Sequence, residues 1–262
     1  MNLKTLANDI RLHAGFTLFL VWLLDIWHFR SSPHFLQIIV YPLLSIALIA
    51  ILDVGLTYFR YRKIYIPTAA VVSGFLIGLI LAPGEPVLVI FLASLLVSLS
   101  KQFLASGARR HIFNPAALGI MGVYLIFGTT VSWWGVAWSW YPLVIIIPLM
   151  MRLLWRLHRI YLPLGFLLVY FIYLFLTSSV DLALRTLTDS TVLLFVLVML
   201  PEPITSPSSG YFKYLFGAGV AISAIFISTF LTIGEVFLPS LLLSNLASFL
   251  ITRITTKAKK VQ

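Results

Sequence analysis

The sequence predicts an all-α, polytopic membrane protein with about ten transmembrane helices. Of its 262 residues, 61% are hydrophobic and only 10% are charged, and the mean hydropathy is +1.05. A soluble domain has roughly 25% charged residues, so these values exclude an ordinary soluble enzyme. They also argue against a transmembrane β-barrel, whose alternating strands are less apolar.

Two further features of the composition narrow the functional classes. The chain has no cysteine, which excludes disulfides and cysteine-ligated iron–sulfur clusters. The net charge of +10 does not indicate a nucleic-acid partner, because Lys and Arg collect in the cytoplasmic loops of membrane proteins. The scattered histidines lack the spacing of a metal site, and none is predicted.

The apolar runs predict one transmembrane domain over 1–262. With both termini in the cytoplasm, every Lys and Arg except Arg30 and Arg185 falls on the inner side, as the positive-inside rule requires. Trp133, Trp134 and Trp138 lie at one outer boundary with further aromatic residues, which predicts interfacial anchoring there. The predicted spans are 14–29, 35–59, 66–82, 87–104, 115–131, 135–154, 160–178, 190–200, 212–232 and 236–252.

Two of the predicted spans are interrupted by prolines. The span 190–200 has a length of only roughly 17 Å and is followed by P-E-P-I-T-S-P, and the span 66–82 is followed by P-G-E-P. Short, interrupted spans in corresponding positions indicate an inverted repeat with a site between the halves, here 14–131 and 135–252. A same-orientation repeat is the alternative, because K-I-Y-I-P at 63–67 is similar to R-I-Y-L-P at 159–163.

The segment 100–121 carries the first candidate site. Asn114 is a natural N-cap and Pro115 a natural first helical residue, so free amides at this helix start favour an anion. Lys101 is the nearby basic residue of the proposed cofactor site, and Arg109, Arg110 and His111 add to its predicted positive charge. The alternative is a capped helix beside an ordinary inner loop.

The segment 200–210 carries the second candidate site. Glu202 stands between two prolines directly after the half-span, and Thr205 and Ser206 supply hydroxyls for a cofactor. Carboxylates within membrane proteins commonly mark ion paths. The candidates for such a path are Asp25, Asp53, Glu85 and Glu202, and a solvated loop acid is the alternative for Glu202.

These two segments together resemble the NqrB/RnfD family of membrane subunits. The similar residues are K-Q-F-x-x-S-G-x-x-x-H-I-F-N-P-A-A-L-G at 101–119 and P-E-P-I-T-S-P-x-x-G-x-x-K-Y-L-F-G-A-G at 201–219. The resemblance covers roughly residues 65–250. It implies a ten-helix inverted repeat similar to urea and ammonium channels, in the cytoplasmic membrane of a prokaryote.

The resemblance also implies a function. It implies a subunit of a flavin-dependent electron-transport complex coupled to Na⁺ or H⁺ translocation, with other membrane subunits as partners, rather than a self-contained enzyme. The cofactor would be FMN or riboflavin. Thr129 and Thr130 are the candidate acceptors of a covalent FMN, although the family's Gly-Ala-Thr sequence is absent here. A stand-alone channel or transporter, and a purely structural subunit, are the alternatives.

Overall fold

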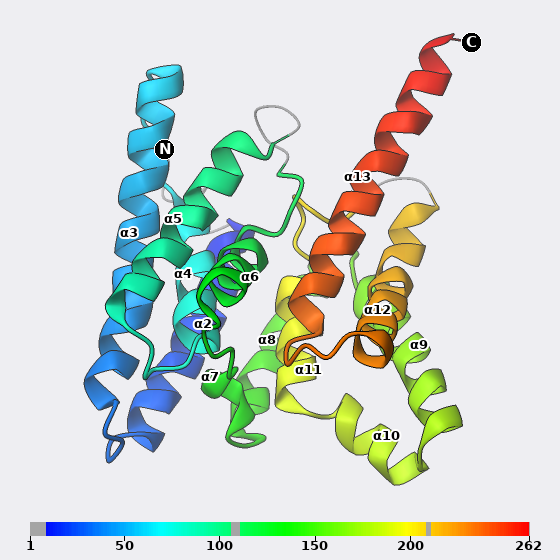
Figure 1. The fold of residues 1–262 in the computed structure, drawn as a ribbon, viewed down its shortest axis with the longest axis horizontal. Helices are drawn as coiled ribbons and strands as arrows, with labels where there is room; N and C mark the ends of the chain where they lie inside the picture. The colour runs from blue at the N-terminus through cyan, green and yellow to red at the C-terminus, as the bar shows by residue number, and fades with distance from the viewer. Residues whose placement is uncertain (1–8, 106–110, 208–210, 262) are drawn as a thin grey trace.

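The computed structural model describes residues 9–105, 111–207 and 211–261, and this part of the chain is helical apart from turns, loops and two isolated bridges. Figure 1 shows a bundle in which long helices such as α3 and α13 run between an upper and a lower end. The helices are α2 (Ile10–His28), α3 (Phe35–Tyr61), α4 (Thr68–Ile80), α5 (Val87–Phe103), α6 (Pro115–Phe127), α7 (Trp134–Ala137), α8 (Tyr141–Arg156), α9 (Tyr161–Thr177), α10 (Val180–Leu187), α11 (Ser190–Leu194), the π-helical η1 (Phe195–Met199), α12 (Phe212–Phe230) and α13 (Phe237–Val261).

The helix lengths and composition agree with a membrane protein. Among the described residues, α2, α3, α12 and the Phe237–Ile254 part of α13 are long and apolar enough to cross a bilayer. The pair formed by α10 and α11–η1 is a fifth candidate, bent by 49° at its break. Since the other apolar helices have 10–17 residues, the arrangement with ten spans stays a prediction.

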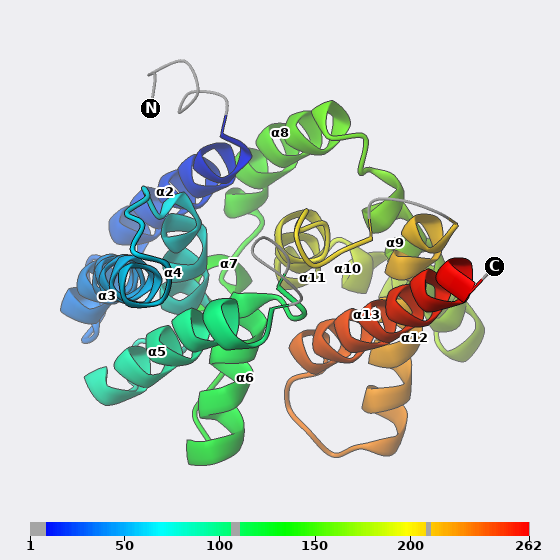
Figure 2. The ribbon, with the colours of Figure 1, turned by 90° about the horizontal axis from the view of Figure 1, so that it is seen from above.

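The helices of the described structure pack in two groups. Seen from above in Figure 2, α2 to α6 lie on one side and α9 to α13 on the other, with α8 beside α2. Within the first group α3 packs on α4 and α5, and within the second α9 packs on α12 and α12 on α13. The groups meet where α2 contacts α8, where α6 contacts α13, and through the short α7, which contacts α2 and α4 as well as α8 and α11. The helix α11 lies near the centre of this view.

Two segments enter the fold from opposite ends and stop inside it. The chain reaches α4 from the upper end of Figure 1, where α3 ends, and reaches α11 from the lower end, where α10 lies. We call the upper end, towards which α2 begins and where α3 ends with Arg60 and Arg62, the basic end. Because α4 has 13 residues, it is roughly 20 Å long and too short to cross the hydrocarbon layer alone.

Several boundaries differ from the predicted spans. The helix predicted over 115–131 ends at Phe127, because Gly128 adopts a left-handed conformation (φ +64°). Residues 130–133 then pair with the end of α4, where Ala82 N donates to Thr130 O at 3.0 Å. The predicted span 135–154 is divided into α7 and α8, and α10 was expected to be part of a loop.

The predicted interfacial anchoring of the tryptophans is wrong for two of them. Trp133 and Trp134 are buried, with exposed fractions of 5% and 9%. The indole of Trp134 donates to Gly78 O at 2.9 Å, so this ring fixes α7 against α4. Trp140 is exposed, as an interfacial residue would be.

Candidate functional site

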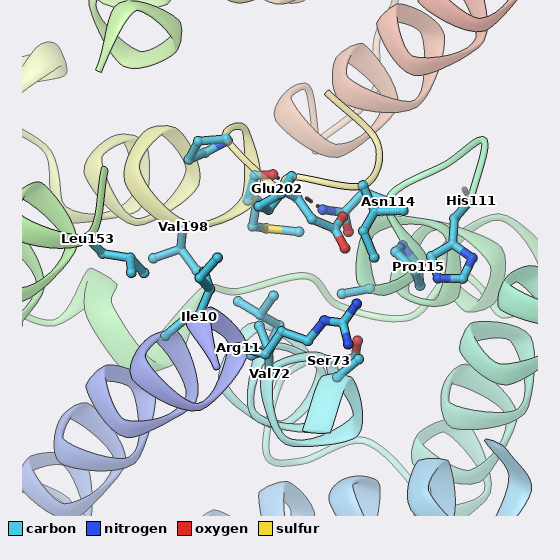
Figure 3. Close-up of a pocket in the computed structure, with 18 of the residues that line it drawn as sticks. Ile10, Arg11, Val72, Ser73, His111, Asn114, Pro115, Leu153, Val198 and Glu202 are labelled. Atoms are coloured by element: carbon cyan, nitrogen blue, oxygen red, sulfur yellow. Dashed lines mark hydrogen bonds between the residues drawn. The ribbon is translucent and has the colours of Figure 1, made fainter. Parts of the chain in front are cut away.

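A cavity of about 260 Å³ lies where the interrupted helix η1 ends. We call it the inner cavity. The start of α2, one face of α4, the start of α6, the end of α8 and residues 201–204 form its wall. The wall is apolar except for a few side chains, of which Figure 3 labels five. The polar residues of the wall are Asp9, Arg11, Ser73, Lys101, His111, Asn114 and Glu202.

Asn114 joins the start of α6 to the end of η1. Its side-chain oxygen accepts from Ala117 N at 3.0 Å, and Pro115 is the first helical residue, which confirms the predicted cap. Its amide nitrogen donates to Met199 O at 3.3 Å. The positive end of one helix dipole therefore meets the negative end of another at the cavity.

Asn245, on α13, was missed in the sequence and connects both candidate segments. Its side-chain oxygen accepts from Asn114 N at 2.9 Å, and its amide nitrogen donates to Thr205 O at 3.4 Å. The residue is buried, with an exposed fraction of 1%. The available signal was a lone amide within the apolar run 236–252, because a buried polar side chain in such a run requires a partner.

Lys101 lies in the cavity wall as half of a buried ion pair. Its ammonium group lies 2.9 Å from Asp53 Oδ2, and both side chains are almost fully buried. Asp53 Oδ1 has no hydrogen-bond partner within the described part of the chain. Because the lysine charge is matched by this carboxylate, Lys101 adds less positive potential to the cavity than the sequence indicated.

The turn that contains Glu202 is held by hydroxyl groups and one arginine. Thr205 Oγ1 donates to Glu202 Oε2 at 3.1 Å, and Ser206 Oγ donates to the backbone oxygen of Glu202 at 2.6 Å. The buried Arg159, at the start of α9, donates to Ser206 Oγ and, at 3.5 Å, to Pro203 O. These bonds fix the turn, so the Glu202 carboxylate is held at the cavity wall.

Arg11 and His111 complete the polar wall. Figure 3 shows the Arg11 side chain extending from α2 into the space between Ser73 and Glu202, with His111 on the side of α6. Burial, together with the charges of Lys101 and Arg11, lowers the pKa of His111 to about 4. The predicted positive charge of His111 is therefore wrong at neutral pH, since a buried imidazole beside two cations stays neutral.

Three other predicted site residues meet at the opposite end of α4. Thr130 N donates to Glu85 Oε1 at 2.7 Å, and Tyr41 Oη donates to the backbone oxygen of Glu85 at 2.7 Å. Thr129 is buried and its hydroxyl has no partner among the described residues, whereas Thr130 is exposed. Thr129, Thr130 and Glu85 are thus near one another and away from the inner cavity.

Asp25 lies apart from the inner cavity, near α7. Trp138 Nε1 donates to Asp25 Oδ1 at 2.9 Å, and His28 stacks on the Trp138 ring with centroids 3.8 Å apart. The carboxyl group is fully buried, and Oδ2 has no hydrogen-bond partner in the described structure. This side chain therefore retains an acceptor for a proton or a cation.

Glu235 is a second residue that sequence reasoning missed. Its Oε1 accepts from Phe237 N at 2.7 Å and Leu238 N at 3.0 Å, and its Oε2 accepts from Trp133 Nε1 at 2.8 Å. It thus caps α13 and connects this helix to the segment paired with α4. Burial raises the pKa of this carboxyl above its usual range, because the surroundings disfavour the charge.

The predicted residues therefore fall into an inner group and an outer group. The outer group contains Glu85, Thr129 and Thr130 beyond the end of α4, and Asp25 beside α7. The inner group surrounds the cavity and contains Lys101, Asn114, Pro115, Glu202, Thr205, Ser206 and Asp53. Arg109 and Arg110, and Ser208, which is a further predicted hydroxyl residue of the second segment, lie outside the described residues. The described residues contain no group of three or more His, Cys, Asp or Glu side chains that could hold a metal ion.

No protein-family model matches the chain, and no curated protein matches it.

Proposed function

We propose that the chain is a membrane subunit of a flavin-dependent electron-transport complex coupled to Na⁺ or H⁺ translocation, of the NqrB/RnfD kind. One observation carries this proposal. The two segments that resemble the family begin at 101 and 201 in the sequence, and they meet at the inner cavity through Asn114, Met199 and Asn245. Other membrane subunits would supply the electron donor, because nearly all of the described chain belongs to the helical bundle.

The same proposal includes an inverted repeat of the two halves, 14–131 and 135–252. Its support is that α4 and α11–η1 enter from opposite ends, and that each is followed by a Pro-Glu-Pro cluster. The start of α6 contacts the end of η1, and Glu235, at the start of α13, contacts Trp133 beside the end of α4. Such crossed contacts are typical of paired broken helices around a transport site.

Within this arrangement Glu202 is the proposed cation-binding residue of the inner group. Its carboxylate lies at the cavity wall, held by Thr205. Asp25 and Glu85 are the proposed cation-binding acids of the outer group. Asp53 would neutralise the positive charge of Lys101, with which it forms an ion pair. The unpartnered Oδ2 of Asp25 supports this assignment, because a buried carboxyl oxygen without a donor can take a proton or a cation.

The residues of the inner cavity fit a flavin ring held without a covalent bond. His111 Nδ1 is buried without a partner in the described structure. The neutral ring bonds the Lys101 backbone through its other nitrogen, so Nδ1 is an acceptor, whereas the Arg11 guanidinium that extends into the cavity is a donor. One acceptor and one donor therefore face an apolar wall built by Met150, Leu153 and Val198. A bound flavin would supply one- and two-electron transfer. Thr129 does not fit a phosphoester acceptor, because its hydroxyl is buried.

An absorption spectrum tests the flavin. The purified chain is expected to show bands near roughly 370 and 450 nm, the ordinary optics of a flavin, and to release the flavin on denaturation because no covalent bond holds it. Arg11→Gln should lower the flavin content, whereas Arg62→Gln, at an exposed position on the same end, should not. A colourless wild-type protein contradicts the flavin assignment.

Cation flux tests the role of Glu202. In liposomes that contain the assembled complex, Glu202→Gln should reduce redox-driven flux by about tenfold or more, because a neutral amide binds a cation poorly. Asp181→Asn is the control, since Asp181 forms an exposed ion pair with Arg185. Equal flux in wild type and Glu202→Gln would contradict the path.

The proposed orientation has a direct test because the chain has no cysteine. Lys63→Cys and Ser31→Cys place single thiols in exposed loops at opposite ends of α3. If the basic end is cytoplasmic, a membrane-impermeant maleimide added to intact cells should label Cys at 31 and spare Cys at 63. The reverse labelling contradicts the orientation.

A stand-alone channel or transporter is the second candidate function. The buried hydroxyl of Thr129 and the missing Gly-Ala-Thr sequence favour it. In this case the purified chain should contain no flavin, and it should by itself conduct ions or a small solute in liposomes. Flavin-containing protein that conducts only when partner subunits and an electron donor are present would exclude it.

A further inference from the structure

A second hollow lies on the outside of the bundle, between α2 and α8. These helices contact each other and are neighbours at the edge of the molecule in Figure 2. Beside the contact is a groove of about 480 Å³, which we call the α2–α8 groove. Leu153 lines both this groove and the inner cavity, so its side chain belongs to the wall between them. The other groove residues are His13, Phe16 and Thr17 of α2, and Leu149, Arg152, Trp155 and Arg156 of α8.

The groove combines basic and apolar side chains in a regular order. On α8, Leu149, Arg152 and Arg156 follow one another at spacings of three and four, so they share a face of the helix. None of the described residues that line the groove is acidic. Two guanidinium groups on one face supply several donors for the oxygens of an anion.

The groove also faces the surroundings of the bundle. Phe16 is 55% exposed and Trp155 is 71% exposed, although both are large apolar side chains. Arg152, Arg156 and His13 are exposed as well, and His13 Nδ1 lies 3.0 Å from Asp9 O. The groove therefore places charged heads next to an exposed apolar wall at the basic end, which matches the boundary between headgroups and acyl chains.

We propose that the α2–α8 groove is a binding site for an anionic phospholipid of the leaflet at the basic end. Arg152 and Arg156 bind the headgroup phosphate, because guanidinium groups bind phosphate with paired hydrogen bonds. One acyl chain lies along Phe16 and Leu149, and Trp155 lies at headgroup level. Basic pockets between transmembrane helices recognise anionic headgroups in this way. The proposal does not depend on a flavin or on cation transport.

Quenching of tryptophan fluorescence tests this site in the full chain. The probe is phosphatidylglycerol with brominated acyl chains, titrated into bilayer nanodiscs of phosphatidylcholine that hold the protein, and brominated phosphatidylcholine is the neutral comparison. The contribution of Trp155 is the difference between wild type and Trp155→Phe. Half-quenching of Trp155 is expected at about a tenfold or more lower mole fraction of the anionic lipid, since each arginine contributes about fivefold.

Matched variants show whether the lipid preference comes from the groove arginines or from the overall positive charge of the protein. Arg152→Gln with Arg156→Gln should remove the preference for phosphatidylglycerol. Arg62→Gln with Arg253→Gln removes the same charge from exposed positions outside the groove and should keep it. Soluble glycerol phosphate should not reverse the quenching, because it lacks the acyl chain. Equal quenching of wild type by both lipids overturns the proposal without any variant, and so does an equal loss of preference in both double variants.

Discussion

The side-chain oxygen of Asn245 accepts a hydrogen bond from the backbone amide of Asn114 at 2.9 Å, across 131 positions of the chain. The same side chain donates to Thr205 O at 3.4 Å. One amide group therefore joins α13, the start of α6 and the turn after η1. The contacts of Asn245 therefore hold together two segments that form the wall of the inner cavity.

Asn245→Ala is expected to destabilise the fold. The change leaves the amide of Asn114 and the oxygen of Thr205 buried without this partner, which costs about 1–3 kcal/mol. The measurement is the apparent unfolding temperature of the protein in detergent, followed by tryptophan fluorescence. Ser248→Ala, one turn further along α13, is the control and should unfold near the wild-type temperature. A wild-type unfolding temperature for Asn245→Ala would contradict the bridging role.

The buried pair of Lys101 and Asp53 leads to a second prediction. Asp53→Asn leaves the ammonium group of Lys101 without its counter-charge, and breaking a buried pair in this way costs about 3–5 kcal/mol. Adding Lys101→Met to this variant removes the stranded charge, so the double variant should regain much of the lost stability. A lower unfolding temperature for the double variant than for Asp53→Asn would show that the pair does not act as proposed.

The lowered pKa of His111 predicts a pH dependence of stability. Its pKa in the fold is about 4, against a usual value of 6.5. The unfolded chain therefore binds a proton first as the pH falls, so the fold should lose stability from pH 6.5 down to about pH 4. The full shift corresponds to at most about 3 kcal/mol. Unfolding temperatures measured across this range should fall more steeply for wild type than for His111→Gln.

The control for this titration is His34→Gln, because His34 is an exposed histidine that does not line the inner cavity. The slope of its unfolding temperature against pH should match that of wild type. If His111→Gln keeps the wild-type slope as well, the acid sensitivity arises from other groups. The assignment of a neutral His111 to the cavity wall would then be wrong.

Features set by neighbouring residues could be predicted from the sequence. The start of α6 at Asn114 and Pro115 follows from an N-cap and a proline whose missing N–H does not matter there. The interruptions at 83–86 and 201–207 follow from two and three prolines within a few residues, each of which removes a backbone donor, whereas the single prolines Pro42 and Pro148 lie inside α3 and α8. The helix α10 was missed although Ser179 caps it, because it lies between the apolar runs 160–178 and 190–200 from which the spans were predicted.

Features set by packing between distant helices could not be predicted. The contact of Asn245 with Asn114 requires α13 to lie against α6, and the contact of Glu235 with Trp133 requires α13 to begin beside the end of α4. The pairing of Lys101 with Asp53 requires α5 to lie against α3. Spacing along one helix does not determine which face of another helix it meets.

The close approach of α3 and α4 leads to the last prediction. A Cβ added at Gly74 would lie 2.6 Å from Ile46 N and 2.7 Å from Ile46 Cα, and backbone atoms cannot move aside as a flexible side chain can. Small residues let helices approach closely in a bilayer. Gly74→Ala should therefore push α4 away from α3 and lower the unfolding temperature strongly, at a cost of about 1–3 kcal/mol or more.

Gly55→Ala, on α3, is the matched control. A Cβ at Gly55 meets nothing within 4 Å, and alanine favours a helix over glycine by about 1 kcal/mol, so this variant should unfold at or above the wild-type temperature. The same change thus has opposite signs at two positions of one helix pair. Equal unfolding temperatures for Gly74→Ala and Gly55→Ala would mean that α4 does not lie against α3 as closely as the structure places it. The wall that α4 contributes to the inner cavity would then also be misplaced.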